Sequence, residues 1–199
     1  MRHPMEWTLI YRVWMAPFAR QKLRPFLRST DLTKVRRVLD VGCGPGTNAD
    51  TFAECDYLGV DINPGYIADA TRRFGNRFRT VDVTQVDAEG LGGAYDCILA
   101  NSLLHHLDDS STERLLTHLE TLLTPDGRIH IVELILPERA SMPRLLARLD
   151  RGDYPRPVER WRQLFESAFT PVVFEPFPVG IPGLPLWSMV YFMGERRAQ

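Results

Sequence analysis

The chain has 199 residues, of which 44% are hydrophobic and 25% are charged, so it can bury one sizeable core, and no segment looks disordered or repetitive. The formal net charge of −1 conceals an uneven distribution, because residues 1–37 carry nine basic and two acidic side chains whereas residues 38–138 carry six and seventeen. The acidic middle argues against a nucleic-acid groove, and three scattered cysteines argue against a disulfide framework or a metal site. We expect one domain, residues 1–199, in a reducing, cytoplasmic compartment.

The start of the chain predicts a helical cap, residues 1–33. Trp7, Ile10 and Trp14 recur at three- and four-residue spacing, as one face of an amphipathic helix requires. Pro17 then opens a second helical piece before the first strand. The basic charge of this cap suits attraction to an anionic surface, and it equally suits packing on the acidic body of the domain.

Two features argue against a membrane span. The first fourteen residues contain Glu6 and Arg12 and lack an uninterrupted apolar core, so they make no convincing signal peptide. The apolar stretch from Ile181 to Met193 is too short and too rich in Pro and Gly to cross a bilayer. We therefore expect no transmembrane segment, and contact with a membrane only at its surface.

Strands and helices alternate from residue 37 onward, and the strands are nearly continuous apolar runs, which is typical of a parallel sheet covered on both faces. After Pro137 a helical lid segment, residues 137–169, precedes two apolar runs with no helix between them, which predicts an antiparallel hairpin. The fold class is therefore α/β with seven strands. In chain order we expect strand 37–41, helix 48–54, strand 57–60, helix 64–74 capped by Asn63, strands 77–81 and 95–100, a helix with the capping box Ser110-x-x-Glu113, a turn at 124–127, strand 128–136, helical residues 141–169, and strands 171–177 and 186–193.

The sequence VLDVGCGPGT, residues 38–47, places three glycines at alternate positions directly after the first strand. In open α/β sheets ligands bind outside the carboxyl ends of the strands, and a glycine-rich turn lets them approach the backbone. Asp40 precedes the first of these glycines by two residues, and Asp61 closes the next strand 21 residues later. Because a carboxylate at Asp61 can accept both hydroxyl hydrogens of a ribose, the pattern predicts a cofactor that contains adenosine.

Two classes of cofactor fit this pattern, the dinucleotides and S-adenosylmethionine. A dinucleotide places its pyrophosphate on the helix N-terminus and usually requires Gly-x-Gly-x-x-Gly, but here Thr47 stands where the third of those glycines is expected. Asp40 is a poor neighbour for a diphosphate and a good one for the ammonium of a methionine, directly or through water. The residues therefore favour S-adenosylmethionine and leave NAD as the alternative.

At these motifs the chain resembles the class I S-adenosylmethionine-dependent methyltransferases of the small bacterial single-domain type, over residues 36–136 motif by motif. The resemblance implies a Rossmann-like, mostly parallel sheet of order 3-2-1-4-5-7-6 with the last strand antiparallel. It also implies that the donor is S-adenosyl-L-methionine and the product S-adenosyl-L-homocysteine. The cofactor-binding residues that it implies lie in the glycine loop, at the ends of the second and third strands and at the end of the fourth: Asp40, Gly42, Cys43, Gly44, Asp61, Ile62, Asp82, Val83 and Asn101.

Two histidines follow the strand end that faces the reaction centre. Methyl transfer from a sulfonium is an in-line displacement, so alignment of the acceptor matters more than any universal catalytic residue. His105 and His106 point in different directions, and we expect one of them to enter the site as a general base; the resemblance favours His106. The alternative is that both are loop histidines bonded to backbone.

The parts outside the central sheet are expected to select the acceptor. Their aromatic side chains predict a small, apolar or aromatic molecule, although core packing is the alternative for each tryptophan. The arginines of the lid segment either hold an acceptor carboxylate or phosphate or are surface charges. The residues concerned are Tyr11, Trp14, Tyr154, Trp161 and Trp187 for contact with the acceptor, and Arg151, Arg156 and Arg160 for its charge.

Two absences narrow the function further. The fourth strand does not end in the Asp/Asn-Pro-Pro-aromatic pattern of enzymes that methylate nucleic-acid bases or glutamine, and no carboxylate set suggests a magnesium site. A metal-free small-molecule methyltransferase, monomeric or homodimeric, is therefore the leading interpretation. The alternatives are an enzyme that uses the same cofactor for other chemistry, and a module that binds a partner or a membrane surface.

Overall fold

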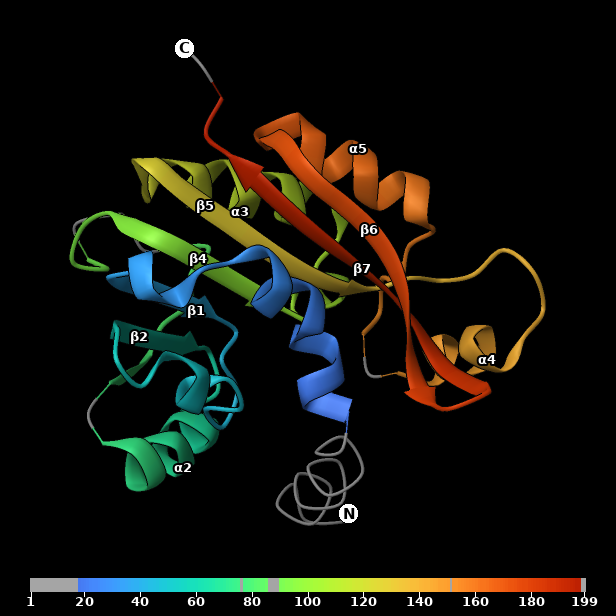
Figure 1. Ribbon diagram of the computed structural model, residues 1–199, viewed down its shortest axis with the longest axis horizontal. Helices are drawn as coiled ribbons and strands as arrows, with labels where there is room; N and C mark the ends of the chain where they lie inside the picture. Colours follow the sequence, from blue (N-terminus) through green and yellow to red (C-terminus); the bar gives the residue numbers. More distant parts are fainter. Residues whose placement is uncertain (1–17, 76, 86–89, 151, 198–199) are drawn as a thin grey trace.

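The structure is a computed structural model that describes residues 18–75, 77–85, 90–150 and 152–197 (Figure 1). One seven-stranded sheet of order β3-β2-β1-β4-β5-β7-β6 runs through these residues, which confirms the predicted order. Residues 18–29 form a helix that is the described part of the predicted cap. The strands are β1 (Arg37–Val41), β2 (Asp56–Asp61), β3 (Phe78–Thr80), β4 (Tyr95–Asn101), β5 (Leu123–Leu134), β6 (Thr170–Ile181) and β7 (Leu184–Glu195); the α-helices are α2 (Pro64–Phe74), α3 (Asp109–Thr121), α4 (Met142–Leu149) and α5 (Val158–Ala168).

The sheet is parallel from β3 to β5, and β7 runs antiparallel between β5 and β6. Its two faces bury separate apolar clusters, one under α3 and α5 and the other under the helix of residues 18–29, α2 and α4. This double cover explains why β1, β4 and β5 read as unbroken apolar runs. The carboxyl ends of β1, β2 and β4 consequently lie at one edge, where a ligand site is expected.

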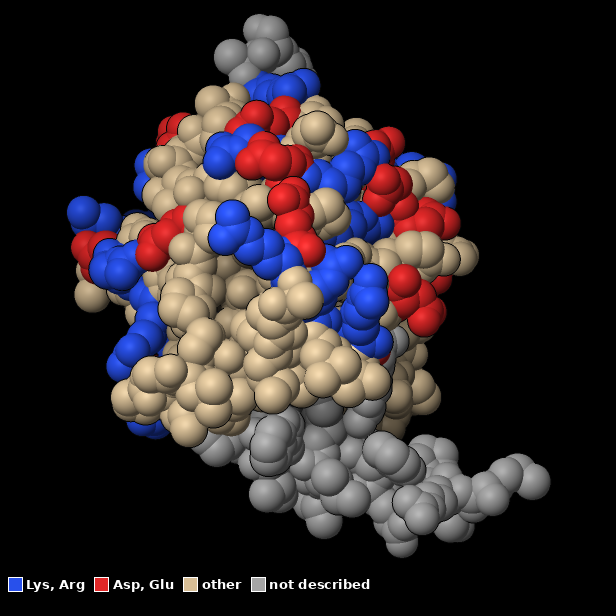
Figure 2. Space-filling view, turned by 90° about the vertical axis from the view of Figure 1, so that its right-hand side faces the viewer, with Lys and Arg blue, Asp and Glu red and all other residues tan. Residues whose placement is uncertain are grey.

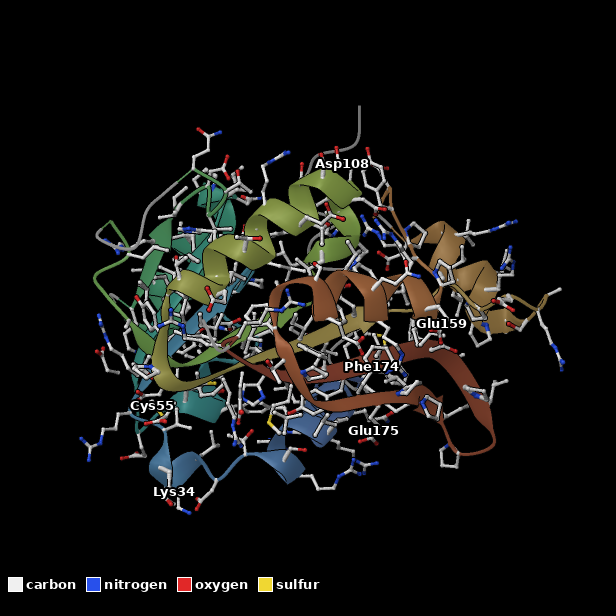
Figure 3. All side chains as sticks on the ribbon, turned by 90° about the horizontal axis from the view of Figure 1, so that it is seen from above. Lys34, Cys55, Asp108, Glu159, Phe174 and Glu175 are labelled. Atoms are coloured by element: carbon white, nitrogen blue, oxygen red, sulfur yellow. The ribbon has the colours of Figure 1, made fainter. Side chains whose placement is uncertain are left out.

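The starts of the helices follow local side-chain chemistry. Asn63 caps α2 by accepting from the amides of Gly65 at 2.9 Å and Tyr66 at 3.3 Å, as predicted. For α3, however, the cap is Asp108 and not Ser110: its carboxylate accepts from the Ser111 amide at 2.7 Å (Figure 3). A carboxylate is the stronger acceptor for an orphan amide, so the helix begins earlier than the capping box indicated.

Two other elements differ from expectation. The helix expected over 48–54 is a single 3-10 turn, Ala49–Phe52. The expected turn at 124–127 lies inside β5, where pairing with β4 jumps from Tyr95↔Leu123 to Cys97↔Arg128. The extra residues are absorbed as an irregularity between two paired segments, so turn-forming residues interrupt this strand without ending it.

The last elements form a hairpin against which α4 and α5 pack. β6 and β7 pair along their length, and α4 packs on β7 while α5 packs on α3. The hairpin also meets the helix of residues 18–29, because the Gln21 side chain accepts from the Gly180 amide at 3.1 Å. None of the helices in the described parts of the chain combines the length and the apolar composition that a bilayer crossing needs.

Candidate functional site

The glycine loop after β1 adopts backbone angles that favour glycine. Gly42, Gly44 and Gly46 have φ values of 70°, 54° and 78°. A Cβ on Gly42 would lie 2.9 Å from the Leu103 side chain, and one on Gly46 would lie 2.9 Å from Phe74. A Cβ on Gly44 would meet nothing within 4 Å. Two of the three glycines thus allow the protein to pack against itself, and Gly44 alone borders open space that a ligand can use.

Asp61, at the carboxyl end of β2, is tied to this loop. Its Oδ2 accepts from the Gly44 amide at 2.9 Å, and its Oδ1 accepts from the Asn63 amide at 2.8 Å. Each carboxylate oxygen keeps further acceptor capacity, and the side chain is partly exposed. The carboxylate is therefore fixed next to the open space at Gly44 and can accept from the hydroxyls of a ribose.

Asp40 is a fully buried carboxylate with an unmet oxygen. Its Oδ2 accepts from the Tyr57 hydroxyl at 2.8 Å and from Asn48 Nδ2 at 3.2 Å, while Oδ1 has no hydrogen-bond partner among the described residues. Burial, only partly offset by these two bonds, raises the pKa of Asp40 to about 7. Because a buried acceptor without a partner is costly, the geometry fits a cationic donor that arrives with a ligand, as the ammonium of a methionine does.

The remaining predicted cofactor residues lie at the same edge with different exposure. Asn101 Nδ2 contacts Asn48 Oδ1 at 3.5 Å, which links the ends of β4 and β1. Asp82 forms a turn in which Oδ1 accepts from the Thr84 amide at 3.0 Å and from the Thr84 hydroxyl at 2.6 Å. Two apolar neighbours and the loop cysteine complete the set: Ile62 is exposed, Val83 is buried, and the Cys43 side chain is buried, so that only its backbone remains for a ligand.

Ser102, directly after β4, has the one positive φ of a non-glycine residue in the described chain, 58°. Its amide donates to the Val132 carbonyl at 2.8 Å, and its hydroxyl accepts from Lys22 Nζ at 3.1 Å. Such a backbone costs roughly 1–3 kcal/mol and is kept where its surroundings hold it, often at a functional site. Here the strain turns the chain at the point where β4 reaches the open edge.

Ser102 and Lys22 belong to a small cavity with a volume of about 10 Å³, which is room for little more than one water molecule. Its lining combines polar and apolar side chains. The lining residues are Lys22, Ser102, His105, Leu134, Asp150, Trp187 and Met189. Burial lowers the pKa of Lys22, although the carboxylates of Asp150 and Glu133 act against this effect. The cavity thus places the buried amino group of Lys22 beside aromatic and aliphatic side chains.

His105 lies in this cavity between two carboxylates. Its Nδ1 is 2.7 Å from Glu133 Oε2 and its Nε2 is 3.2 Å from Asp150 Oδ1. Burial lowers the pKa of His105, but the two carboxylates outweigh it and raise the pKa to about 9. Both ring nitrogens are therefore occupied and the ring is charged near neutral pH, so His105 holds Asp150 over the cavity and is not free to take a proton.

His106 does not line the cavity and is exposed, although its ring lies 4.4 Å from that of His105. The two rings thus lie against each other, and it is His105, and not the His106 that the resemblance favours, that lines the cavity. Residues 152–154 pack directly on His105. A Cβ on Gly152 would lie 2.0 Å from the His105 ring, and the Tyr154 amide donates to the His105 carbonyl at 2.9 Å.

The predicted acceptor residues divide into three groups. Tyr11 and Trp14 lie outside the described residues. Tyr154 is exposed, and Trp187 lines the cavity. Trp161 is fully buried and donates from Nε1 to the Leu134 carbonyl at 2.8 Å, so it packs in the core beneath α5 and does not line the cavity.

The lid arginines that the structure describes bind the protein itself. Arg156 Nε donates to Asp109 Oδ1 at 2.6 Å and Nη2 donates to the Leu107 carbonyl at 2.6 Å, while Arg160 bonds to Asp109 Oδ2 at 2.7 Å. Arg156 is 5% exposed, which leaves it no surface for an acceptor. These arginines fasten the lid to the start of α3; Arg151 lies outside the described residues.

Sequence reasoning missed the residues that give the cavity its charge. Glu133 carried a signal, because it is a charged residue within the apolar strand β5, and such a residue needs buried partners. Asp150 lies in the lid segment that was expected to help select the acceptor, but nothing in the sequence gave it a role of its own, and Lys22 is one of several basic residues in its helical segment. Tertiary contacts bring them together, since Lys22 donates to Ser102 and Asp150 pairs with His105.

The family model described as a methyltransferase domain matches residues 11–175. The trans-aconitate 2-methyltransferase of Methylobacterium nodulans is 34% identical over 118 residues, which are 55% of this chain and 44% of that protein. An uncharacterized methyltransferase of Mycobacterium tuberculosis is 35% identical over 103 residues, 50% of this chain and 51% of that protein. This chain thus spans about half the length of these two curated relatives.

Solved structures share the fold. The N-methyltransferase NodS of Bradyrhizobium japonicum, in complex with S-adenosyl-L-homocysteine, superposes with a TM-score of 0.69 at 18% identity over 90% of this chain and 86% of that chain. The PH0226 protein of Pyrococcus horikoshii gives a TM-score of 0.69 at 18% identity over 94% and 91%. At such identity the likeness concerns the architecture, and residue roles rest on the geometry of this chain.

Proposed function

This chain belongs to the class I S-adenosylmethionine-dependent methyltransferases, and from that premise we propose that it transfers a methyl group to a small acceptor that binds beside Ser102, at the small cavity there. S-adenosylmethionine is the cofactor; when bound, it supplies a methyl on a sulfonium, whose carbon–sulfur bond breaks as the acceptor atom forms its bond to the methyl carbon. The buried Oδ1 of Asp40, which has no hydrogen-bond partner among the described residues, carries the proposal. A cationic donor bound at the glycine loop would satisfy this oxygen.

In this proposal each predicted residue contacts a different part of the cofactor. Asp40 accepts from the ammonium, Asp61 accepts from the ribose hydroxyls, and the loop backbone with Gly44 borders the ligand. At the same edge Asn101 faces the methionine part. The residues that would surround the adenine are Ile62, Asp82 and Val83.

The acceptor site is proposed to work by position and polarity, without a free general base. Trp187 and Met189 give the cavity apolar lining, and Lys22 donates to Ser102 and, we propose, to a heteroatom of the acceptor. His105 stays a positioning residue, because both of its nitrogens are engaged. This arrangement suits a small, partly apolar acceptor that carries an oxygen or nitrogen near its reacting atom.

Binding of the cofactor is tested with Asp61→Ala. We expect the affinity for S-adenosylmethionine, measured by isothermal titration calorimetry, to fall by about 10-fold or more, because charge-assisted hydrogen bonds contribute about 1.5–3 kcal/mol. Asp50→Ala, an exposed aspartate nearby, is the matched control and is expected to leave the affinity unchanged. Equal affinities for the two variants would remove Asp61 from the site, and heat on titration with NAD in place of S-adenosylmethionine would overturn the cofactor itself.

Transfer is tested with Lys22→Met, which keeps the length of the side chain and removes the ammonium. We expect release of S-adenosylhomocysteine with a panel of small acids, phenols and amines to fall by about 10-fold to 100-fold for the acceptor that wild type prefers. Affinity for S-adenosylmethionine is expected to stay within a factor of about two, because Lys22 contacts the cavity side of Ser102. The control is Lys34→Met, an exposed lysine at the end of the 3-10 turn Leu32–Lys34. Unchanged turnover in Lys22→Met would place the acceptor elsewhere.

A further inference from the structure

The outer face of α4 is apolar and open to solvent. Met142, Leu145 and Leu149 are 50%, 53% and 71% exposed. They follow one another at three- and four-residue spacing and so share one face of the helix, while Ala147 on the opposite side is buried on the sheet. Single exposed apolar residues need no explanation, but three on one short helix form a continuous stripe.

The tip of the β6–β7 hairpin extends this stripe. Ile181 and Leu184 are 54% and 46% exposed and pair with each other across Pro182 and Gly183, whose φ of 79° makes a tight turn. Because α4 packs on β7, helix and tip lie at the same corner of the molecule (Figure 1). Together these five residues, Met142, Leu145, Leu149, Ile181 and Leu184, are called the α4–hairpin surface.

Positive charge accompanies the α4–hairpin surface. Residues 139–149 contain Arg139, Arg144 and Arg148 and no acidic residue. Figure 2 shows this side of the molecule with a broad area free of charged side chains, above which blue side chains lie together with red ones. An apolar stripe bordered by arginines is the pattern of a helix that lies in a membrane interface, with its apolar side in the lipid and its cations near anionic headgroups.

We propose that the α4–hairpin surface docks on a membrane that contains anionic lipid. The tip of the hairpin suits contact with lipid, where a backbone amide without a hydrogen-bond acceptor is costly. Pro182 and Pro185 carry no amide hydrogen, so fewer such donors lie at the tip. Pairing with a second copy through the edge strand β6 is less favourable, since Pro171, Pro176 and Pro178 interrupt its donors. The charges and the backbone chemistry therefore favour lipid over a second copy of this chain.

Docking there would bring lipid close to the cavity. Asp150, which caps the end of α4, and Trp187, three residues beyond Leu184, both line it. An apolar acceptor dissolved in the membrane would then have a short path to the site. This consequence for the acceptor rests on the proposed function, whereas docking itself is independent of methyl transfer.

Vesicle flotation tests the proposal directly. With vesicles of equal parts phosphatidylcholine and phosphatidylglycerol we expect wild type to float, and Leu145→Glu combined with Leu149→Glu to reduce the bound fraction by about 10-fold, because the change removes two apolar contacts and adds two charges of the wrong sign. Arg148→Gln is the milder second variant, with an expected loss of about threefold to fivefold at low salt. Val172→Glu, at an exposed apolar position at the other end of β6, is the control and is expected to float like wild type.

The remaining outcomes are decisive against the proposal. Absence of wild type from the floated fraction, or equal flotation of the double variant and Val172→Glu, would overturn it. A wild type that stays off vesicles but elutes as a dimer, with the double variant monomeric, would show instead that this surface joins two copies. S-adenosylmethionine titration of every variant checks that each is folded, and it separates failure of docking from failure of the proposed cofactor site.

Discussion

Replacing Asp40 by asparagine is expected to weaken S-adenosylmethionine binding by about 100-fold at about pH 8 and to abolish the pH dependence of that binding, since removing one partner of a buried charge pair costs about 2–5 kcal/mol. The wild-type carboxyl has a pKa of about 7, because its burial disfavours the ionised form. An ammonium beside Oδ1 requires the ionised form, so binding below about pH 7 must release a proton, and the affinity is expected to fall about tenfold for each unit below that pH. Calorimetric titrations from about pH 5.5 to about pH 8 check both statements.

The same substitution has an opposite effect on the ligand-free chain. The folded pKa of Asp40, about 7, lies above the unfolded value of about 3.9, so the folded state binds more protons between these pH values. Stability of wild type is therefore expected to decrease as pH rises through this window, by at most about 4 kcal/mol from this group. Asp40→Asn lacks the titration and should show a smaller decrease in thermal melting temperature over the same range. Parallel melting curves for the two proteins would show that Asp40 is already compensated without ligand, and would remove the basis for its role.

The fold was predictable because its signals are local. Unbroken apolar strands indicate a sheet covered on both faces, and Asn63 followed by Pro64 indicates the start of α2 from neighbouring residues alone. Prediction failed where neighbouring residues could also form the expected feature. Asp108, and not Ser110, is the N-cap of α3, and residues 124–127 lie within β5 and do not form a separate turn. Such choices depend on tertiary pairing, which the turn-forming residues themselves do not encode.

The site was predictable on the cofactor side and much less so on the acceptor side. The glycine loop, Asp40 and Asp61 are recognisable because the turn after the first strand fixes their spacing in sequence. Even there the sequence does not tell Gly44, which borders open space, from Gly42, which the Leu103 side chain packs against. Lys22 comes to the cavity from a helix far away in sequence, and no local pattern marks it.

The second large effect is expected at Glu133, which no motif marked. This fully buried carboxylate accepts from the amides of Leu103 at 2.8 Å and Leu104 at 2.6 Å and pairs with His105 at 2.7 Å. Glu133→Ala leaves both amides and a charged ring without their acceptor. We expect a loss of about 3–5 kcal/mol in the free energy of unfolding, seen as a fall of about 10 °C or more in melting temperature.

Glu133→Gln distinguishes the two tasks of this side chain, because an amide oxygen can still accept from the backbone while the charge is gone. We expect it to recover part of the melting temperature and to change the alkaline limb. In wild type the folded pKa of His105, about 9, exceeds the unfolded value of about 6.5, so its stabilisation is complete below the lower value and is lost as pH rises through about 9. Without the carboxylate this loss should begin at a lower pH. The control Glu138→Ala, at an exposed position, should leave melting and pH profile unchanged.

The Glu133 variants also decide how the strained turn at Ser102 is held. The two amides that Glu133 binds follow Ser102 directly, so the carboxylate fixes the loop whose backbone carries the positive φ. If that anchoring matters for the site, Glu133→Gln should lose more methyl transfer than affinity for S-adenosylmethionine, since Asp40 and Asp61 stand on other strands. An equal loss of both would mean that the substitution unsettles the whole strand edge. A third outcome is turnover equal to wild type at a lowered melting temperature. It would mean that the buried charges only stabilise the fold, and that Lys22 and the apolar residues of the cavity align the acceptor.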